Sequence, residues 1–364
     1  MTVEQQAVFA VVVVLRLGIP LFIPRFPLPA LLACLVVDGI DQTIFQWFHV
    51  TAVLDEYQSY DKALDVYYLV IAYTATMRNW HDGVAFRIGQ ALWYWRLIGT
   101  VAFEYSGWSP LLLIFPNAFE YFVIAYEGIR TRWRPTRLSD RQLIYLAGGI
   151  VVFVKIPQET WIHVLQLDVT DEIAAHPVLA VLVFAAAAIA LAGTVAAGRS
   201  RVPPPDWRFT VVVDRHQARK RPDTRPEGLR TLLWTTGEKA ALITMVVLIF
   251  GHILPTTAGG GALTLGVCVT VALNAGVTEW LEERRMVPQP LHWRFAVGVV
   301  INAVIFEALI LLRPAVSVDR VSALFLLFLL SLIITLYDHC RAVSYGIPVD
   351  APGERTATAV SPAT

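Results

Sequence analysis

The chain has 364 residues, of which 56% are hydrophobic and only 16% are charged. A soluble protein of this size usually carries about a quarter charged residues, so the composition argues against a soluble globular protein. The formal net charge at pH 7 is zero, so bulk charge gives no sign of a nucleic-acid partner. The composition instead predicts a membrane protein whose first partner is the lipid bilayer.

Apolar runs recur along the whole chain, and they do not alternate with polar residues as barrel strands do. A helix needs about 20 apolar residues to cross the hydrocarbon core, so the sequence predicts an all-α, polytopic transmembrane helix bundle of about eleven spans (about 10 to 12). Several spans are expected to kink at proline. The predicted spans are residues 7–23, 29–48, 61–77, 85–104, 109–127, 143–165, 177–197, 239–256, 262–281, 295–312 and 320–338.

Residues 1–345 are predicted to form one transmembrane domain. Within it, residues 198–238 are rich in proline and arginine, which indicates a basic, solvated cytoplasmic loop within reach of anionic lipid headgroups. Residues 346–364 are rich in proline, alanine and threonine and predict a disordered C-terminal tail.

The distribution of arginine between the loops predicts the orientation. Loops 128–142, 198–238 and 282–294 are rich in arginine, whereas 166–176 is acidic and 257–261 is uncharged. Because basic loops stay in the cytoplasm, the C-terminus is expected to be cytoplasmic and the N-terminus outside. The N-terminus lacks the basic segment of a signal peptide, so the first apolar run is expected to be retained. The predicted location is a bacterial inner membrane.

Ionisable residues within predicted spans are candidates for function because each costs several kcal/mol in hydrocarbon unless it is paired or hydrated. Asp38 and Asp41 are three residues apart in the second span, and Asp61 and Asp65 are four apart in the third. Each pair therefore shares one face of a helix. The two helices form a hairpin, so we expect the four carboxylates to converge.

The sixth span carries a polar stripe in which Lys155, Glu159 and His163 are spaced four residues apart. Pro157 within the stripe is expected to kink or restart the helix. Helices two to six are thus predicted to enclose a polar cavity open to the outer face. The candidate lining residues are Asp38, Asp41, Asp61, Asp65, Arg96, Asn117, Glu120, Lys155, Glu159 and His163.

A structural interpretation of the same residues stays open. In it, Asp38 or Asp41 neutralises Arg16, and Lys155 pairs with Glu159. Two further charged positions are predicted to lie outside the site: Glu127 and Arg130 as a surface pair, and His81 and Asp82 as residues of a tight cytoplasmic turn.

The spacing Asp38-x-x-Asp41 followed by Asp61-x-x-x-Asp65 resembles that of the CDP-alcohol phosphatidyltransferases. In that family, aspartates on two neighbouring helices hold divalent metal against a diphosphate, so the resemblance implies a metal site at these four residues. The chain departs from the family pattern, because Gln42 and Tyr57 stand where the family has glycine. Residues 115–121 and 155–163 are similar to segments of multi-pass membrane proteins of actinobacteria, a group that implies no activity.

Three functions are compatible with these features. The first is a transporter or permease for a small polar or ionic solute. In it, the buried acids would carry protons or bind a cation, and the prolines would break the helices around them. The second is a membrane-embedded enzyme, such as a transferase, that acts on a lipid-linked substrate. The third is a non-catalytic assembly partner. A divalent cation is the one cofactor that the sequence leaves open, and it points to no catalytic residue and no oligomeric state.

Overall fold

A computed structural model describes residues 2–50, 57–160, parts of 175–193, 203–213, 229–253, 260–283, 291–312 and 320–344. All regular elements in these residues are helices, and the described residues contain no strand. The predicted all-α class is therefore confirmed. Most of the predicted span 177–197, the candidate residue His163 and the predicted tail 346–364 lie outside the described residues.

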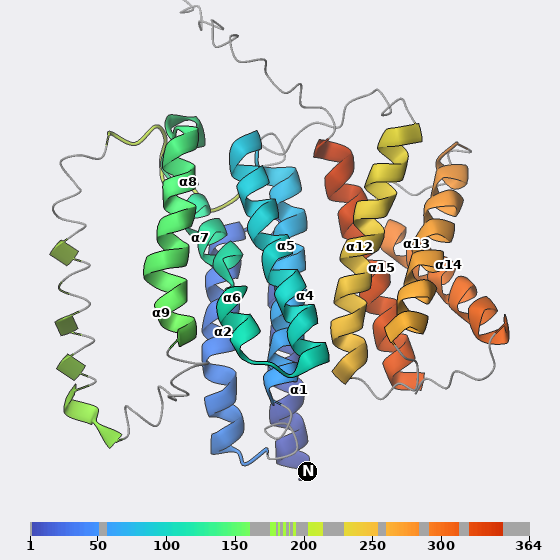
Figure 1. The fold of residues 1–364 in the computed structure, drawn as a ribbon, viewed down its shortest axis with the longest axis horizontal. Helices are drawn as coiled ribbons and strands as arrows, with labels where there is room; N and C mark the ends of the chain where they lie inside the picture. The colour runs from blue at the N-terminus through green and yellow to red at the C-terminus, as the bar shows by residue number, and fades with distance from the viewer. Residues whose placement is uncertain are drawn as a thin grey trace, which may run out of the picture.

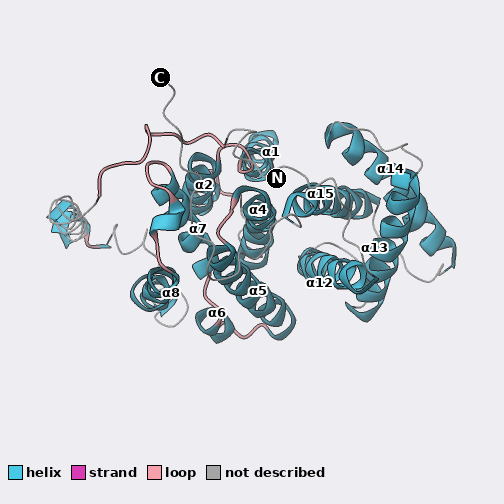
Figure 2. Ribbon diagram, turned by 90° about the horizontal axis from the view of Figure 1, so that it is seen from above, coloured by secondary structure: helices cyan, strands magenta, loops and turns pink. Residues whose placement is uncertain are grey.

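The first half of the chain forms a group of helices that we call the N-terminal bundle (Figures 1 and 2). Helices α5 and α7 pack against each other, and α2 lies beside both α4 and α7. The elements are α1 (Val3–Gly18), η1 (Ile19–Phe22), α2 (Pro27–Trp47), α4 (Tyr57–Asn79), α5 (Gly83–Ser106), α6 (Pro110–Ile114), α7 (Ala118–Arg130), η2 (Pro135–Arg137), α8 (Asp140–Gly149), the π-helical turn η3 (Ile150–Lys155) and α9 (Ile156–Glu159).

Four long helices make up the C-terminal bundle, on the right of Figure 1. They are α12 (Leu229–Ile253), α13 (Gly260–Glu283), α14 (Leu291–Leu312) and α15 (Arg320–Ser344). Helices α12 and α15 pack against α4, and α12 also packs against α5. Helix α4 is therefore the main element of the N-terminal bundle that faces the C-terminal bundle, as the view from above in Figure 2 shows.

Local sequence signals explain where the helices begin and end. Thr2 and Ser139 form capping boxes with Gln5 and Gln142, and the Asp82 side chain accepts from the first backbone N–H groups of α5. Asp82 is thus the turn residue that the sequence predicts. Helix α5 ends at Gly107, whose φ of 64° is left-handed and suits glycine.

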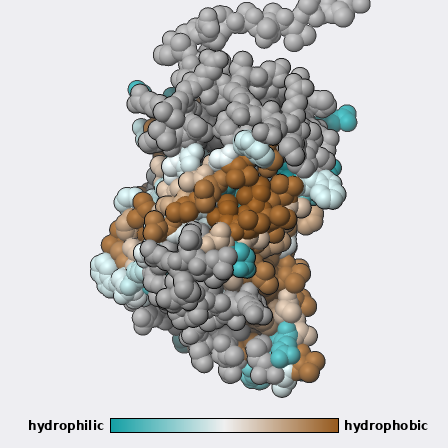
Figure 3. Space-filling view, turned by 90° about the vertical axis from the view of Figure 1, so that its right-hand side faces the viewer, coloured by the Kyte–Doolittle hydropathy of each residue, from teal (hydrophilic) through white to brown (hydrophobic). Residues whose placement is uncertain are grey.

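Five of the described helices are long and apolar enough to cross a membrane: Val3–Phe22, Pro27–Trp47, Pro110–Arg130, Leu291–Ala308 and Ser322–Cys340. Figure 3 shows a broad hydrophobic surface on the side of the C-terminal bundle. Helices α13 and α14 of this bundle expose Leu265, Val300 and Val304. Such a large exposed apolar area suits contact with lipid tails. These features agree with a membrane protein, while the total of about eleven spans stays a prediction.

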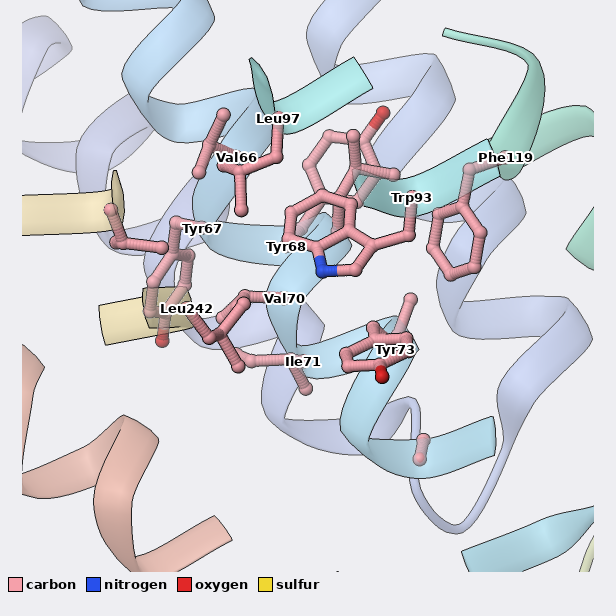
Figure 4. Packing of buried hydrophobic residues seen from close by; sticks show 14 of the residues in the cluster. Val66, Tyr67, Tyr68, Val70, Ile71, Tyr73, Trp93, Leu97, Phe119 and Leu242 are labelled. Atoms are coloured by element: carbon pink, nitrogen blue, oxygen red, sulfur yellow. The ribbon is translucent and has the colours of Figure 1, made fainter. Parts of the chain in front are cut away.

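Aromatic side chains from α4, α5 and α7 fill the centre of the N-terminal bundle (Figure 4). Tyr73 and Trp93 stack with ring centroids 5.9 Å apart, and Phe119 packs against Trp93 at 5.6 Å. All three side chains are fully buried. This packing fixes the relative positions of the helices that carry the candidate site.

Residues 203–213, part of the predicted basic loop 198–238, lie against the end of α7. The backbone N–H of Thr210 donates to the carbonyl of Thr131 at 3.0 Å, and that of Val213 donates to the carbonyl of Arg25 at 3.0 Å. The indole of Trp207 donates to the carbonyl of Arg130 at 3.1 Å. This part of the predicted solvated loop is therefore anchored to the bundle by backbone hydrogen bonds.

The prediction that Glu127 and Arg130 form a surface pair is confirmed for the pairing and wrong for the position, because Glu127 is buried. Glu127 is only 4% exposed, and its carboxylate accepts hydrogen bonds from the indole of Trp80 and from Arg130, both at 2.7 Å. It is buried because it lies on the face of α7 that carries Val123 and Tyr126 into the core.

Candidate functional site

Arg16 is the one basic residue of α1, and its side chain is 3% exposed. The guanidinium donates hydrogen bonds to Asp38 and Asp41, which lie on one face of α2. A buried guanidinium is costly unless carboxylates pair with it, so these contacts hold the end of α1 against α2.

Helix α4 brings two more carboxylates to the same guanidinium. Asp61 Oδ1 lies 3.0 Å and Asp65 Oδ1 lies 3.1 Å from Arg16 nitrogens. Lys62 supplies a second cation, with its Nζ 2.6 Å from Asp61 and 3.7 Å from Asp65. Asp61 and Asp65 both reach Arg16 because residues four apart share one face of a helix. We call Arg16, Asp38, Asp41, Asp61, Lys62 and Asp65 the Arg16 cluster.

The Arg16 cluster contains more acids than bases. None of its six side chains is more than 24% exposed, and that of Asp41 is fully buried. With every group ionised, four carboxylates face two cations. Buried charge of one sign is strongly unfavourable in a medium of low polarity. The cluster is therefore suited to take up protons or a cationic ligand.

The same residues can be tested against the divalent metal that the spacing of the aspartates implies. Oxygens of Asp38, Asp61 and Asp65 lie within 4.8 Å of one another, which is close enough to share one ion. Each of these carboxylates, however, is already bonded to Arg16, and Lys62 lies against two of them. The ionised cluster is net negative and would attract a divalent ion, but these oxygens are already engaged, so the ion could bind only by displacing Arg16 and Lys62 from them.

Asn117 and Glu120 form a second polar group, at the break between α6 and α7. The helix stops at Ile114 and restarts at Ala118, and this interrupts the hydrogen-bonded backbone within the span 110–130. The Asn117 amide donates to Glu120 Oε2 at 2.9 Å. Both residues are buried, with 5% and 3% of their surface exposed.

The break is held by α5. The guanidinium of Arg96 donates to the carbonyl of Phe115 at 3.2 Å, and the indole of Trp95 donates to the carbonyl of Ile114 at 3.0 Å. These bonds satisfy carbonyl groups that the interrupted helix leaves free. Gly99 lets the two segments approach, because a Cβ there would lie 2.1 Å from the Cβ of Phe115.

Lys155 and Glu159 form a buried ion pair, with Nζ and Oε1 3.0 Å apart. Lys155 also donates to Gln158 at 3.0 Å and lies 4.9 Å from the centre of the Tyr121 ring. The described part of the predicted polar stripe is thus an internally paired unit that faces α7. The third residue of the stripe, His163, lies outside the described residues.

The three polar groups are neighbours. Glu120 interacts electrostatically with Asp65 of the Arg16 cluster on one side, and with Arg96 and Lys155 on the other. The side chain of Tyr68, one turn along α4 from Asp65, lies beside the Glu120 carboxyl. Direct contacts thus join the four aspartates through Arg16, Asn117 to Glu120, and Lys155 to Glu159. The charges of Asp65, Arg96 and Lys155 act on Glu120, which lies among these groups.

A cavity of about 290 Å³ lies elsewhere, beneath the segment 203–213. Its lining includes His81, Asp82, Glu127 and Arg130, which belong to the end of the bundle with the basic loops. Nearby, the backbone N–H of Arg134 and then the guanidinium of Arg137 lower the pKa of the exposed Asp206 carboxyl. The cavity expected at the outer end of helices two to six stays a prediction.

Arg16 and Lys62 were not among the sequence-derived candidates, although they are the cations around which the aspartates assemble. One signal was present for Arg16, since it is a single charge in an otherwise apolar run of α1. Such a residue faces a partner inside the bundle.

Comparison of the chain with protein families, with curated proteins and with solved structures finds no match. The side-chain geometry of the chain itself is therefore what indicates a function.

Proposed function

We propose that this chain is a multi-pass protein of a bacterial inner membrane, with about eleven spans and a cytoplasmic C-terminus, that transports a small polar or ionic solute. In this proposal the Arg16 cluster is the centre at which a proton or a solute cation binds. The outer-facing cavity predicted within helices two to six is the route to it.

The excess of carboxylates over cations in the Arg16 cluster carries the proposal. A structural ion pair needs one carboxylate for Arg16, whereas four are bonded to it. Buried acids beyond those needed for pairing are costly to keep and mark ion or proton pathways in membrane proteins. The broken helix at residues 115–117 supports the same function, because irregular backbone at membrane depth suits a wall of a transport pathway.

The test is transport by the purified protein in proteoliposomes. Vesicles loaded with a pH-sensitive dye would be exposed in turn to gradients of Na⁺, K⁺, ammonium, guanidinium and neutral polyols. Wild-type protein is expected to give a proton or solute flux with at least one of these solutes. Asp41→Asn, Glu159→Gln and His163→Ala are each expected to abolish it at unchanged expression.

Asp140→Asn is the matched control, because Asp140 is exposed in the first turn of α8 and far from the cluster in sequence and contacts. It is expected to leave the flux unchanged. Flux retained in all three cluster and stripe variants would end the transport proposal. If those variants instead lowered only the thermal stability, the polar residues would be structural and the chain an assembly partner.

One observation keeps a second function under test. The closeness of Asp38, Asp61 and Asp65 is what a membrane enzyme acting on a lipid-linked diphosphate would use to hold a divalent ion. Added Mg²⁺ that raises the thermal stability of wild-type protein, but not of Asp38→Asn, would favour this enzyme over the transporter.

A further inference from the structure

Glu120 and Asn117 each have a buried oxygen that is poorly matched. Neither Glu120 Oε1 nor Asn117 Oδ1 has a partner of ordinary hydrogen-bond geometry among the described residues. The Tyr68 hydroxyl interacts with the Glu120 carboxyl as a weak donor. The remaining atoms of the pair are matched, because Asn117 Nδ2 donates to Glu120 Oε2 at 2.9 Å. A buried acceptor without a donor costs about 1–3 kcal/mol, so two of them on neighbouring side chains need an explanation.

One proton accounts for both oxygens. An ionised carboxylate only accepts hydrogen bonds, whereas a protonated one also has an O–H that donates. If Glu120 Oε1 carries a proton, that oxygen becomes a donor, and Asn117 Oδ1 is the unmatched buried acceptor on the side chain to which Glu120 is already bonded. A proton on Glu120 thus turns one of the two unmatched acceptors into a donor for the other.

We propose that Glu120 is a proton-binding site in the membrane interior, held by the Asn117 amide at the break between α6 and α7. The site releases its proton when the O–H bond at Glu120 Oε1 breaks, and the proton passes to another acid or to water. The carboxylate that remains is stabilised by the nearby cations Arg96 and Lys155.

Every element packed around Glu120 contributes a group that affects this exchange. Helix α2 contributes Cys34, α4 contributes Asp65 and Tyr68, α5 contributes Arg96, and the π-helical turn contributes Lys155. Arg96 and Lys155 place positive charge, and Asp65 places negative charge, around the Glu120 carboxyl. The charge on the Arg16 cluster, to which Asp65 belongs, therefore acts on the proton at Glu120. A cation that binds the cluster would weaken the effect of Asp65 and favour proton release from Glu120.

The role of this proton in coupling depends on the proposed transport function, whereas the presence of the proton does not. The first experiment therefore needs no solute. Infrared spectra of the full-length protein in lipid at neutral pH are expected to contain the carbonyl band of a protonated carboxyl that disappears in Glu120→Gln. The band is expected to move to higher frequency in Asn117→Ala, because that variant removes the hydrogen bond to Glu120 Oε2.

Glu104→Gln is the control, since Glu104 is an equally buried acid of α5. It is expected to keep the band that Asn117→Ala shifts. A spectrum in which Glu120→Gln removes no protonated-carboxyl band, while the variant remains folded by circular dichroism, would overturn the proposal whether or not the chain transports anything.

A second experiment tests the coupling in the proteoliposomes described above. Proton flux driven by the transported solute is expected to be lost in Glu120→Gln, while exchange of labelled for unlabelled solute continues. If Glu120→Gln lacks the infrared band but keeps the solute-driven proton flux, Glu120 binds a proton that is not coupled to solute transport. If wild-type protein showed no flux at all, the result would count against the transport function alone and not against the proton at Glu120.

Discussion

The two bundles satisfy their buried polar groups in different ways. In the C-terminal bundle, the Asn274 amide donates to Asn302 at 2.8 Å, and the Asn302 amide donates to Ser331 at 2.9 Å. These residues join α13, α14 and α15 through neutral hydrogen bonds. An ion pair in the described part of this bundle is balanced, with Lys239 of α12 2.8 Å from Asp338 of α15. In the N-terminal bundle, Arg16 and four aspartates join α1, α2 and α4 through ionic contacts.

The difference shows which polar residues helix packing requires. A neutral chain of amides and hydroxyls links three helices, and each of its hydrogen bonds stabilises the packing by about 0.6 kcal/mol. It leaves no net charge inside the protein. Ionic contacts connect a similar number of helices at a much larger desolvation cost. Neutral hydrogen bonds would be sufficient for packing. The four carboxylates around Arg16 in the N-terminal bundle therefore point to a function that uses charge.

The largest expected effect comes from Arg16→Leu. The change removes the guanidinium that is bonded to four carboxylates. Removing one partner of a buried ion pair typically costs about 3–5 kcal/mol. We expect a large fall in the midpoint of thermal unfolding in detergent. Part of the loss should be recovered when Arg16→Leu is combined with Asp41→Asn, because the second change removes one negative charge from the cluster.

Asn302→Leu is the corresponding change in the C-terminal bundle and sharpens the comparison. It removes the middle of the neutral chain at a cost of about 1–3 kcal/mol, without leaving a buried charge. Transport activity of the variant is expected to survive. If Asn302→Leu destabilised the protein as much as Arg16→Leu, the contrast between the two bundles would lose its energetic basis.

An intermediate effect is expected from Gly99→Ala. The added Cβ would lie 2.1 Å from the Cβ of Phe115, so α5 and the break before α7 must separate. Overpacking of this kind costs about 1–3 kcal/mol. Gly266→Ala in α13 is the matched control, because no atom lies within 4 Å of its added Cβ. It should leave the thermal midpoint unchanged or slightly raised, and equal losses in both variants would show that close approach is not the cause.

The spacing of the aspartates allows their convergence to be predicted from the sequence. Asp38 and Asp41 share one face of α2, Asp61 and Asp65 share one face of α4, and the hairpin brings the two faces together. The sequence also offers Arg16 as the partner of Asp38 or Asp41, and the structure confirms both contacts. Its contacts with Asp61 and Asp65 are harder to predict. Helix α1 is apolar on nearly all sides, so no amphipathic pattern shows which way its single arginine turns.

The burial of Glu127 had a local signal, because it lies four residues from Val123 on the face of α7 that enters the core. The segment 203–213 at the same end of α7 had none, since Trp207 bonds to a residue 77 positions earlier. Local patterns contain no information about such a contact. For Glu120, the sequence predicts Asp65, Arg96, Asn117 and Lys155 in the same group of helices, whereas Cys34 and Tyr68 were not among the expected neighbours.

The smallest expected effect concerns Asp206, which fixes the segment 203–213 from an exposed position. The backbone N–H of Arg134 and the guanidinium of Arg137 lower the pKa of this carboxyl below its ordinary value. A group whose pKa is lowered by folding stabilises the folded segment above its ordinary pKa of about 3.9, and that contribution disappears as the pH falls through the lowered value. Asp206→Asn should therefore remove a pH-dependent contribution that is present at neutral pH.

Limited proteolysis at Arg208 can measure this contribution, because cleavage there requires the segment to leave α7. At neutral pH, trypsin is expected to cut Asp206→Asn faster than wild type, by a small factor, since the ion pair is exposed and screened by water. The difference should shrink in high salt. Asp140→Asn, which carries the same chemical change at an exposed position without a bond to this segment, should be cut at the wild-type rate. Equal rates in all three proteins would mean that the backbone bonds of Thr210 and Val213 hold the segment by themselves.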